Sequence, residues 1–256
     1  MLQKKRLRKY LNKRWKGLKT ELKTLKKCPD DDALHELRLN AKKIKAIVSL
    51  FKSTGSKHKL STKSIKALFQ QAGDIRTAKL NLKKIRDNHI NNRPLQLFLT
   101  DIINYEYKDL CSKYKCYIKT INSLRKKFDD AVASVTDRDV KKYYKKNISQ
   151  LSISFLWPID IQSLHDNRKI IKNLLYINKV LPAATRKSIR LDVKYLDQLQ
   201  EKIGLWHDFD LTRDLLNKHG LVHIAGYASL FCQQMSVLEC VKKDVDFFGN
   251  KVALKK

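Results

Sequence analysis

Two segments of the chain place a histidine at the head of a series of cations that recur with helical spacing. In "LHELRLNAKKIK", residues 34–45, His35 is followed by Arg38, Lys42 and Lys45 at offsets of three, seven and ten residues. At 3.6 residues per turn these side chains fall on one narrow arc of a helix, along about 15 Å of its length. Such a row of cations suits an extended anion with many charges better than a single phosphate.

The second segment, "LHDNRKIIKNLL" at residues 164–175, repeats the arrangement with His165, Arg168 and Lys172, and Tyr176 extends the arc by one turn. A charge run on a helix is usually a solvated face. Like charges at this spacing, however, destabilise a helix by tenths of a kcal/mol per pair, and no row of acids accompanies either series. Because the unfavourable pattern occurs twice, we expect both rows to line one shared groove or channel for a polyanion.

Each segment also carries an apolar face, which predicts how its helix packs. In the second segment Ile171 and Leu174 supply this face, and in the first segment Lys43 lies to one side of the cationic arc. The residues of the first segment and its continuation that we expect to face the core are Leu34, Leu37, Ala41, Ile44, Val48 and Phe51. The pattern therefore predicts two helices, each with a buried stripe and a row of cations.

The overall charge supports a polyanionic partner. The 256 residues include 55 Lys and Arg against 25 Asp and Glu, which gives a formal net charge of +30. Self-repulsion of that size destabilises a compact state unless anions gather around the molecule. Nucleic acid, an anionic membrane surface and a phosphate polymer all satisfy this requirement, and net charge alone does not choose among them.

Several features favour a soluble, cytoplasmic protein. No apolar run approaches the roughly 18–20 residues that a membrane span needs, and "MLQKKRLRKYLNKRWKG" at the start does not resemble a signal peptide. The five cysteines contain no Cys-x-x-Cys pair, so neither a disulfide framework nor a zinc ribbon is indicated.

The distribution of apolar residues predicts an all-α fold. Hydrophobic residues make up 43% of the chain, with only seven Gly and four Pro, and no alternation typical of strands persists. We expect Gly73 and Gly204 to separate helices, and the stretch that follows Pro94 to be one long amphipathic helical segment. The other expected helices cover residues 2–27, 33–52, 60–71, 74–90, 161–180, 183–203 and 223–247.

Two landmarks recur at nearly one period. His35 and His165 lie 130 residues apart, and Gly73 and Gly204 lie 131 apart. Fixed order at nearly equal separation is typical of an internal duplication. We therefore expect a single domain over 1–256, made of two related helical halves, roughly 1–130 and 131–256, packed around a pseudo-twofold axis.

Four segments of the chain resemble the CHAD family, the conserved-histidine α-helical domains, and they occur in the order that the family has. "PDDDALHELRLNAKKIKAIVSLF" and "LHDNRKIIKNLLYI" resemble its two signatures of a histidine followed by basic residues. "LDQLQEKIGLWHDFDLTRDLL" is similar to the Leu-x-x-Leu-Gln-x-x-Leu-Gly-x-x-His-Asp segment of the family, and "IKALFQQAGDIRTAKLNL" is similar to its counterpart in the first half. Together the four matches span essentially the whole chain.

The resemblance implies two pseudo-symmetric antiparallel helical bundles around a basic central cavity that binds inorganic polyphosphate. The residues of this chain that it marks as contact or support residues are His35, Arg38, Lys42, Lys43, Lys45, Lys66, Arg76, His165, Arg168, Lys172, Tyr176 and His207. The chain departs from the family pattern at Thr77, Asn173, Leu175 and Asp197, and Lys replaces Arg at several positions. The second half is thus expected to contribute less charge, and part of the bidentate Arg–phosphate geometry is lost.

We therefore predict a noncatalytic polyphosphate-binding protein without metal or cofactor, associated with polyphosphate granules or with regulation of polyphosphate. The alternative is a nucleic-acid-binding protein, because Trp15, Trp157 and Trp206 could stack on bases, although such aromatics usually pack in a core.

A zinc site at His219 and His223 is disfavoured because Gly220 interrupts the helix between them. Phosphoryl transfer would need a Gly-rich phosphate loop or clustered acids, and neither is evident. Asp208 and Asp210 are expected to orient His207 or cap a helix.

Overall fold

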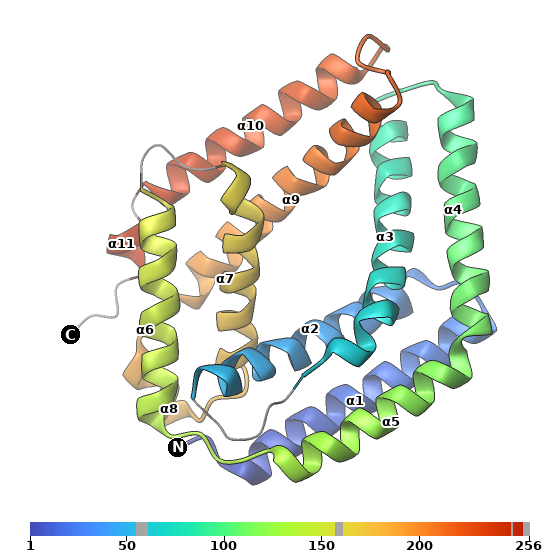
Figure 1. Ribbon diagram of the computed structural model, residues 1–256. Coiled ribbons are helices and arrows are strands. Elements are labelled where there is room, and N and C mark those ends of the chain that lie inside the picture. The colour runs from blue at the N-terminus through green and yellow to red at the C-terminus, as the bar shows by residue number, and fades with distance from the viewer. Residues whose placement is uncertain (55–60, 157–160, 247, 253–256) are drawn as a thin grey trace.

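The computed structural model of the protein describes residues 1–54, 61–156, 161–246 and 248–252 (Figure 1). All regular elements within these ranges are helices, which confirms the all-α class, and Leu2 and Val135 form an isolated antiparallel bridge. None of the helices described is long and apolar enough to cross a bilayer. In chain order the elements are α1 (Lys4–Lys27), α2 (Asp31–Ser53), the 3-10 turn η1 (Lys63–Ile65), α3 (Lys66–Asp87), α4 (Arg93–Ser112), α5 (Tyr114–Ala131), α6 (Asp137–Ser154), η2 (Ile161–Ser163), α7 (Leu164–Asn178), α8 (Ala183–Ile189), α9 (Val193–Lys218), α10 (Tyr227–Val245) and α11 (Phe248–Lys251).

Neighbouring helices pack in pairs around the middle of the molecule. The pairs α1 with α5, α3 with α4, α9 with α10 and α6 with α7 form the sides of a frame (Figure 1). Helix α2 contacts α1, α3 and α7, and α9 contacts both α7 and α3. The helices α2, α3, α7 and α9 therefore meet at the centre, although the first two lie far from the last two in the sequence.

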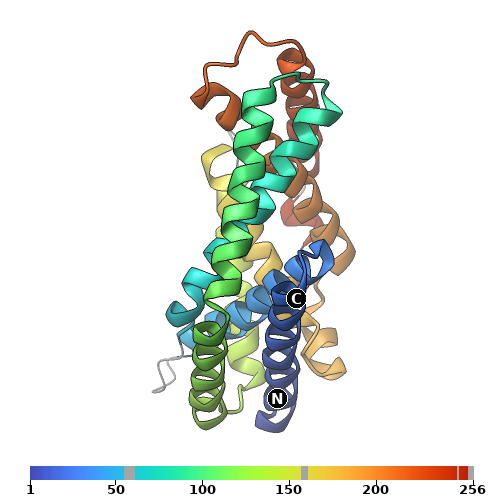
Figure 2. The same cartoon turned by 90° about the vertical axis from the view of Figure 1, so that its right-hand side faces the viewer.

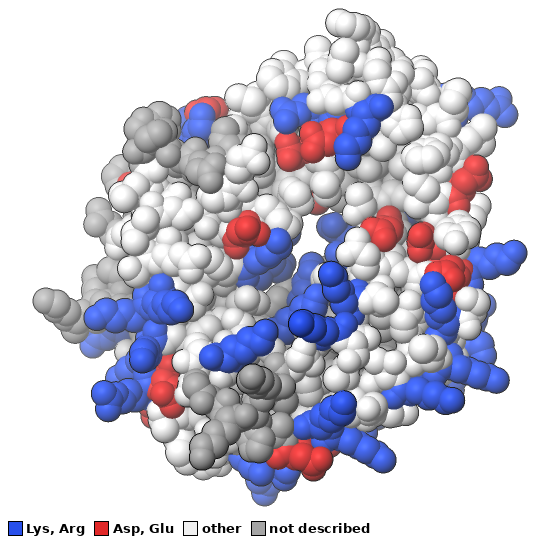
Figure 3. Space-filling model, viewed as in Figure 1, with Lys and Arg blue, Asp and Glu red and all other residues white. Residues whose placement is uncertain are grey.

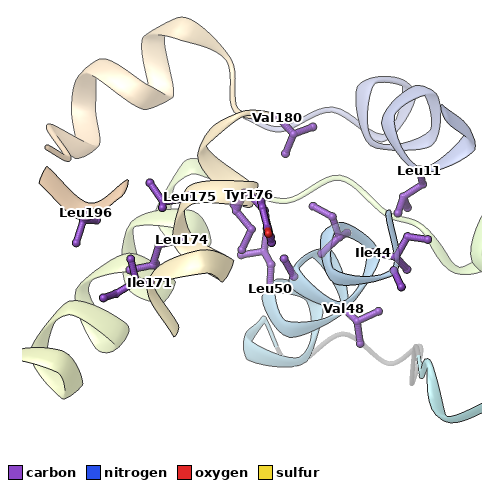
Figure 4. Close-up of a cluster of buried hydrophobic side chains, with 14 of the residues drawn as sticks. Leu11, Ile44, Val48, Leu50, Ile171, Leu174, Leu175, Tyr176, Val180 and Leu196 are labelled. Atoms are coloured by element: carbon purple, nitrogen blue, oxygen red, sulfur yellow. The ribbon is translucent and has the colours of Figure 1, made fainter. Parts of the chain in front are cut away.

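The apolar face of α2 holds this arrangement together. The six residues predicted to face the core on this helix are all buried, and Ile171 and Leu174 of α7 are fully buried as well. Figure 4 shows Leu11 of α1, Ile44 of α2 and Leu174 of α7 in one cluster of apolar side chains. Burial of a side chain of this size contributes about 1.5–3 kcal/mol. The apolar face thus fixes the rotation of α2 and α7 about their axes, and with it the direction of the cations on the opposite arc.

Short polar side chains set the beginnings of the helices. Asp30 caps α2 by accepting a hydrogen bond from the backbone N–H of Ala33, and Asp31 and Asp32 place negative charge in the first turn. Asp192 caps α9 in the same way. An acceptor at this position satisfies a backbone donor that has no partner within the helix, and negative charge complements the helix dipole.

The helix boundaries differ from the expected ones at four places. Gly73 and Gly204 lie inside α3 and α9 rather than between helices. Arg190 adopts a left-handed conformation (φ 50°), so the segment expected as one helix over 183–203 is divided into α8 and the start of α9. The stretch after Pro94 is likewise two helices, because the chain turns at Lys113 without any Gly or Pro to signal it. Residues 60 and 247, two expected helix ends, lie outside the described residues, as does Trp157.

Candidate polyanion-binding site

A cavity of about 340 Å³ lies between the four central helices, and its lining is strongly basic. Figure 3 shows a hollow in the middle of the molecular face, with Lys and Arg side chains around it. The residues that line the cavity are Arg38, Lys42 and Lys45 from α2, Phe69, Arg76 and Thr77 from α3, His165, Arg168, Lys169, Lys172, Asn173 and Tyr176 from α7, and His207, Asp208 and Leu211 from α9.

Phe69 positions the cations on the α2 side. The guanidinium of Arg38 donates a hydrogen bond to the backbone carbonyl of Phe69 at 3.2 Å and lies over its ring, 4.8 Å from the centroid. The ammonium of Lys45 lies over the same ring at 3.5 Å. The negative face of an aromatic ring attracts cations, by about 0.5–2 kcal/mol each. Phe69 thus stabilises two like charges near each other without supplying a counterion.

Gln200 positions the cations on the α7 side. Its backbone carbonyl accepts a hydrogen bond from Nε of Arg168 at 3.0 Å, and its side-chain Oε1 accepts one from Nζ of Lys172 at 3.2 Å. The amide nitrogen of Gln200 donates to Asp197 at 3.1 Å, which fixes the orientation of the side chain. Gln200 is buried, so both cations are attached to a rigid part of α9.

The two glycines that were expected to break helices allow α3 and α9 to approach the arginines. A Cβ at Gly73 would lie 2.6 Å from Nη1 of Arg38. A Cβ at Gly204 would meet the guanidinium of Arg168 at three atoms, with Cζ and Nε both at 2.8 Å. Each arginine therefore packs against a helix that has no side chain at the point of contact. Glycine is required here for close approach, not for a turn.

The cations of the two rows face one another across the cavity. Burial, followed by the charges of Arg38, Lys172, Arg168 and Arg76 in that order, lowers the pKa of Lys42 to about 7. Burial likewise lowers the pKa of Lys172 to about 8, with Arg168 as the next cause. Lys42 of α2, Arg76 of α3 and the cations Arg168 and Lys172 of α7 all line the same cavity. The expectation of two facing rows is therefore consistent with the electrostatics of the site.

Few carboxylates compensate this charge. Among the described residues, Arg38, Lys42, Lys45, Arg168 and Lys172 form no ion pair with an acid. The lining cations that do have an acidic partner are Arg76, 3.6 Å from Asp208, and Lys169, 2.8 Å from Asp166. Asp208 thus pairs with an arginine, and Asp210 pairs with Arg213 and accepts from Gln234 rather than orienting His207. Buried charges without an ion-pair partner are costly, which indicates that an external anion could stabilise these cations.

Three lining side chains hold buried polar atoms that have no hydrogen-bond partner in the described part of the chain. These atoms are Nε of Arg38, Nδ1 of His165 and the hydroxyl of Tyr176. Burial raises the pKa of Tyr176 to about 12, so its hydroxyl stays protonated and can donate. Because native proteins pair nearly all buried polar groups, three unpaired ones around a single cavity point to a ligand with acceptor oxygens.

The two cavity histidines form a pair. The rings of His165 and His207 stack with centroids 4.0 Å apart and planes tilted by 37°. Burial, then the neighbouring His207, lowers the pKa of His165 to about 4, and burial also lowers the pKa of His207. Both imidazoles are therefore neutral at neutral pH. A neutral imidazole donates one hydrogen bond from the nitrogen that carries the proton, which suits it to contact a phosphate oxygen directly.

The structure brings nine of the twelve sequence-predicted site residues to the cavity and leaves three outside. His35 is exposed one turn before the cavity begins, and Lys66 is exposed at the start of α3. Lys43 points away toward α1, as its position beside the cationic arc indicated. The lining residues that the sequence analysis did not single out are Phe69, Lys169 and Leu211. The sequence does hold a signal for Phe69: it lies four residues, about one helical turn, before Gly73, and Gly73 is the point where Arg38 packs on α3.

The described residues contain no group of three or more His, Cys, Asp or Glu side chains placed to hold a metal ion. His219 follows the end of α9 and its ring lies 5.2 Å from that of Phe98. Gly220, with φ at 68°, continues the turn away from the helix, so His219 and His223 do not share a helical face.

The chain thus combines an all-helical fold with a basic cavity that contains few carboxylates, and comparison with known proteins identifies its family. The CHAD domain family matches residues 80–217, and the chain belongs to this family. The crystal structure of the CHAD domain from the plant Ricinus communis is similar over 95% of this chain and 91% of that one, with a TM-score of 0.72 and 15% sequence identity. No curated protein matches the chain.

The contact between Gly204 and Arg168 gives a test of how the cavity is built. We expect Gly204→Ala to weaken polyanion binding about fivefold, since a misplaced charged hydrogen bond costs about 1 kcal/mol or more. Gly73→Ala should have a smaller effect, because its Cβ crowds only one terminal nitrogen of Arg38. Both variants should keep their helical content, because Ala favours a helix interior by about 1 kcal/mol over Gly. Calorimetric titration with tripolyphosphate and circular dichroism measure the two effects, and a larger loss for Gly73→Ala would contradict this geometry.

Proposed function

We propose that this protein binds inorganic polyphosphate in the central cavity, without catalysing a reaction on it. The observation that carries the proposal is the convergence of cations from α2, α3 and α7 on one cavity where most of them have no carboxylate partner. The unpaired donors of Arg38 and Tyr176 would bind phosphate oxygens, and the rows of cations would bind successive phosphate groups. Membership of the CHAD family, which is linked to polyphosphate binding in general, supports the same ligand.

The distribution of charge in the site supports a linear anion. The cations that line the cavity are spread along α2 and α7 rather than gathered around one point. A phosphate polymer carries its charge along an unbranched chain without bulky groups, whereas a nucleic acid carries bases and sugars as well. Trp15 and Trp206 are buried, so neither offers a face on which a base could stack.

The paired contacts on the two sides also support the proposed duplication. Arg38 packs on Gly73 and donates to the carbonyl of Phe69, and Arg168 packs on Gly204 and donates to the carbonyl of Gln200. We propose that the two halves of the chain each contribute one row of cations to a single site. Granules of polyphosphate in the cytoplasm would then be the natural location of such a protein.

Competition between polymers tests the proposed ligand. We expect long-chain polyphosphate to displace single-stranded RNA from the protein at equal phosphate concentration, and to bind with an affinity that falls steeply with salt, as for other polyanions. Fluorescence anisotropy of labelled RNA at two salt concentrations measures both. If polyphosphate fails to displace the RNA, nucleic acid is the better ligand. Release of phosphate during a prolonged incubation with magnesium would overturn the noncatalytic assignment.

A further inference from the structure

The outer face of α1 carries a second row of cations, separate from the cavity. Six exposed lysines recur at intervals of three, four or seven residues, so they fall within about 80° of one another at 100° per residue. The buried leucines and Trp15 of this helix occupy the opposite side. The row extends for about 33 Å along the helix at 1.5 Å per residue. Its members are Lys5, Lys9, Lys13, Lys16, Lys23 and Lys27.

Packing of α1 does not use this row. Helix α5 lies beside α1 (Figure 2) and is contacted by other side chains: Arg8 donates to the carbonyl of Asp129, Lys19 donates to Asn122, and Lys26 lies over the ring of Tyr114. None of the six lysines forms an ion pair with a carboxylate of the described residues. The row therefore adds repulsion between like charges without a compensating ion pair among the described residues, which favours a surface for an external anion.

Two further cations, Arg14 of α1 and Lys43 of α2, lie where these two helices pack together. Lys43 is adjacent to the cavity residue Lys42, and its pKa is lowered by burial and then by the nearby charge of Arg14, with Lys13 among the further causes. Arg14 lies over the ring of Tyr10 at 5.2 Å and donates to Asn40 at 3.2 Å, while its buried Nε has no partner in the described residues. Lys43 and Arg14 thus lie between the helix that lines the cavity and the helix that carries the row, which gives a role to a predicted site residue that lies outside the cavity.

We propose that the lysine row on α1 is a second binding surface for the same polyanion, so that a long polyphosphate chain held in the cavity passes over Lys43 and Arg14 and continues along α1. This inference rests on the proposed function. The row would add affinity for long chains only, because a chain that binds two linked sites gains avidity that a chain confined to one site does not.

A flexible chain fits the row better than the other large anions. The apolar residues of α1 are buried in the core, so the helix has no apolar face to insert into a membrane. A nucleic acid duplex is stiff, with its phosphates on helical strands, and a straight row on a convex helix could reach only a few of them. Lysines act as point charges that adapt to phosphates at varying positions, as a mobile chain requires.

A charge-matched pair of variants tests the inference. The first carries Lys5→Gln, Lys9→Gln, Lys16→Gln and Lys23→Gln on α1. The control removes the same four charges from the exposed lysines of α6, through Lys141→Gln, Lys142→Gln, Lys145→Gln and Lys146→Gln. Affinity for tripolyphosphate and for chains of about one hundred phosphates is measured at several salt concentrations, because loss of an avidity contact appears only with the long polymer.

For the α1 variant we expect affinity for long chains to fall at least about tenfold and the salt dependence to weaken by about 3 in log–log slope, at roughly 0.7 per lost phosphate contact. Tripolyphosphate binding should be unchanged relative to the α6 control. Equal long-chain affinities of the two variants would overturn the inference and leave the cavity proposal intact. Loss of RNA or anionic-vesicle binding by the α1 variant, without loss of long-chain affinity, would also overturn it. Failure of the unmodified protein to bind tripolyphosphate would instead count against the cavity.

Discussion

The double variant Lys42→Gln, Lys172→Gln is expected to lose tripolyphosphate binding and, at pH 6, to unfold at a higher temperature than the unmodified protein. Each lysine would donate a charged hydrogen bond to phosphate, worth about 1.5–3 kcal/mol, so loss of both reduces affinity at least about hundredfold. The same ammonium groups are desolvated and lie among arginines in the ligand-free protein. Their removal relieves this repulsion, and we expect unfolding free energy to rise by about 2 kcal/mol.

Titration calorimetry and thermal denaturation measure these opposite effects in one preparation. The matched control is Lys141→Gln, Lys142→Gln, which removes two charges from the exposed surface of α6 and should change neither quantity appreciably. A double cavity variant that binds tripolyphosphate like the unmodified protein would show that the anion is not held between α2 and α7. A lowered melting temperature would show that the two lysines are compensated in a way that the structure does not contain.

Binding and stability are also expected to depend on pH in opposite directions. In the ligand-free protein the pKa of Lys42 is about 7 and that of Lys172 about 8, against 10.5 for an unperturbed lysine. Between these values the unfolded chain holds more protons than the folded one, so the free energy of unfolding should rise as pH increases from about 7 to 10. A bound polyanion favours the charged ammonium, so binding takes up protons, and affinity should fall over the same range.

The size of the pH effect follows from proton linkage. Above about pH 8 both lysines are largely neutral without ligand, so the logarithm of affinity should fall by up to about two per pH unit. Long chains are the suitable ligand, since their internal phosphates stay ionised while terminal groups titrate near pH 6. Calorimetry in two buffers of different ionisation enthalpy measures the protons taken up. An affinity that is constant from pH 6 to 9, with no proton uptake, would contradict the facing rows of cations.

Helical periodicity alone was sufficient to predict the direction of the cations. On α2 the apolar face is buried as expected, and Arg38, Lys42 and Lys45 on the opposite arc all line the cavity. Periodicity does not say how far the cavity extends along the helix. His35 lies on the same arc but one turn beyond the cavity, and it is exposed.

Features that depend on contacts between distant segments could not be predicted from local pattern. Gly73 and Gly204 are residues typical of helix breaks, yet each lies within a helix, where the missing side chain lets an arginine from another helix pack against it. The support that Gln200 gives to Arg168 and Lys172 requires α7 and α9 to be adjacent. The turn at Lys113 has no local signal, and only the packing of α4 on α3 and of α5 on α1 separates the two helices.

The most direct measurement is a crystal structure of the protein with bound tripolyphosphate. We expect the anion between α2 and α7, with its oxygens within hydrogen-bond distance of Lys42, Arg168 and Lys172 and of the Tyr176 hydroxyl that has no partner in the ligand-free cavity. An anion bound only on the outer surface, with the cavity side chains unmoved and the cavity free of phosphate, would contradict the assignment.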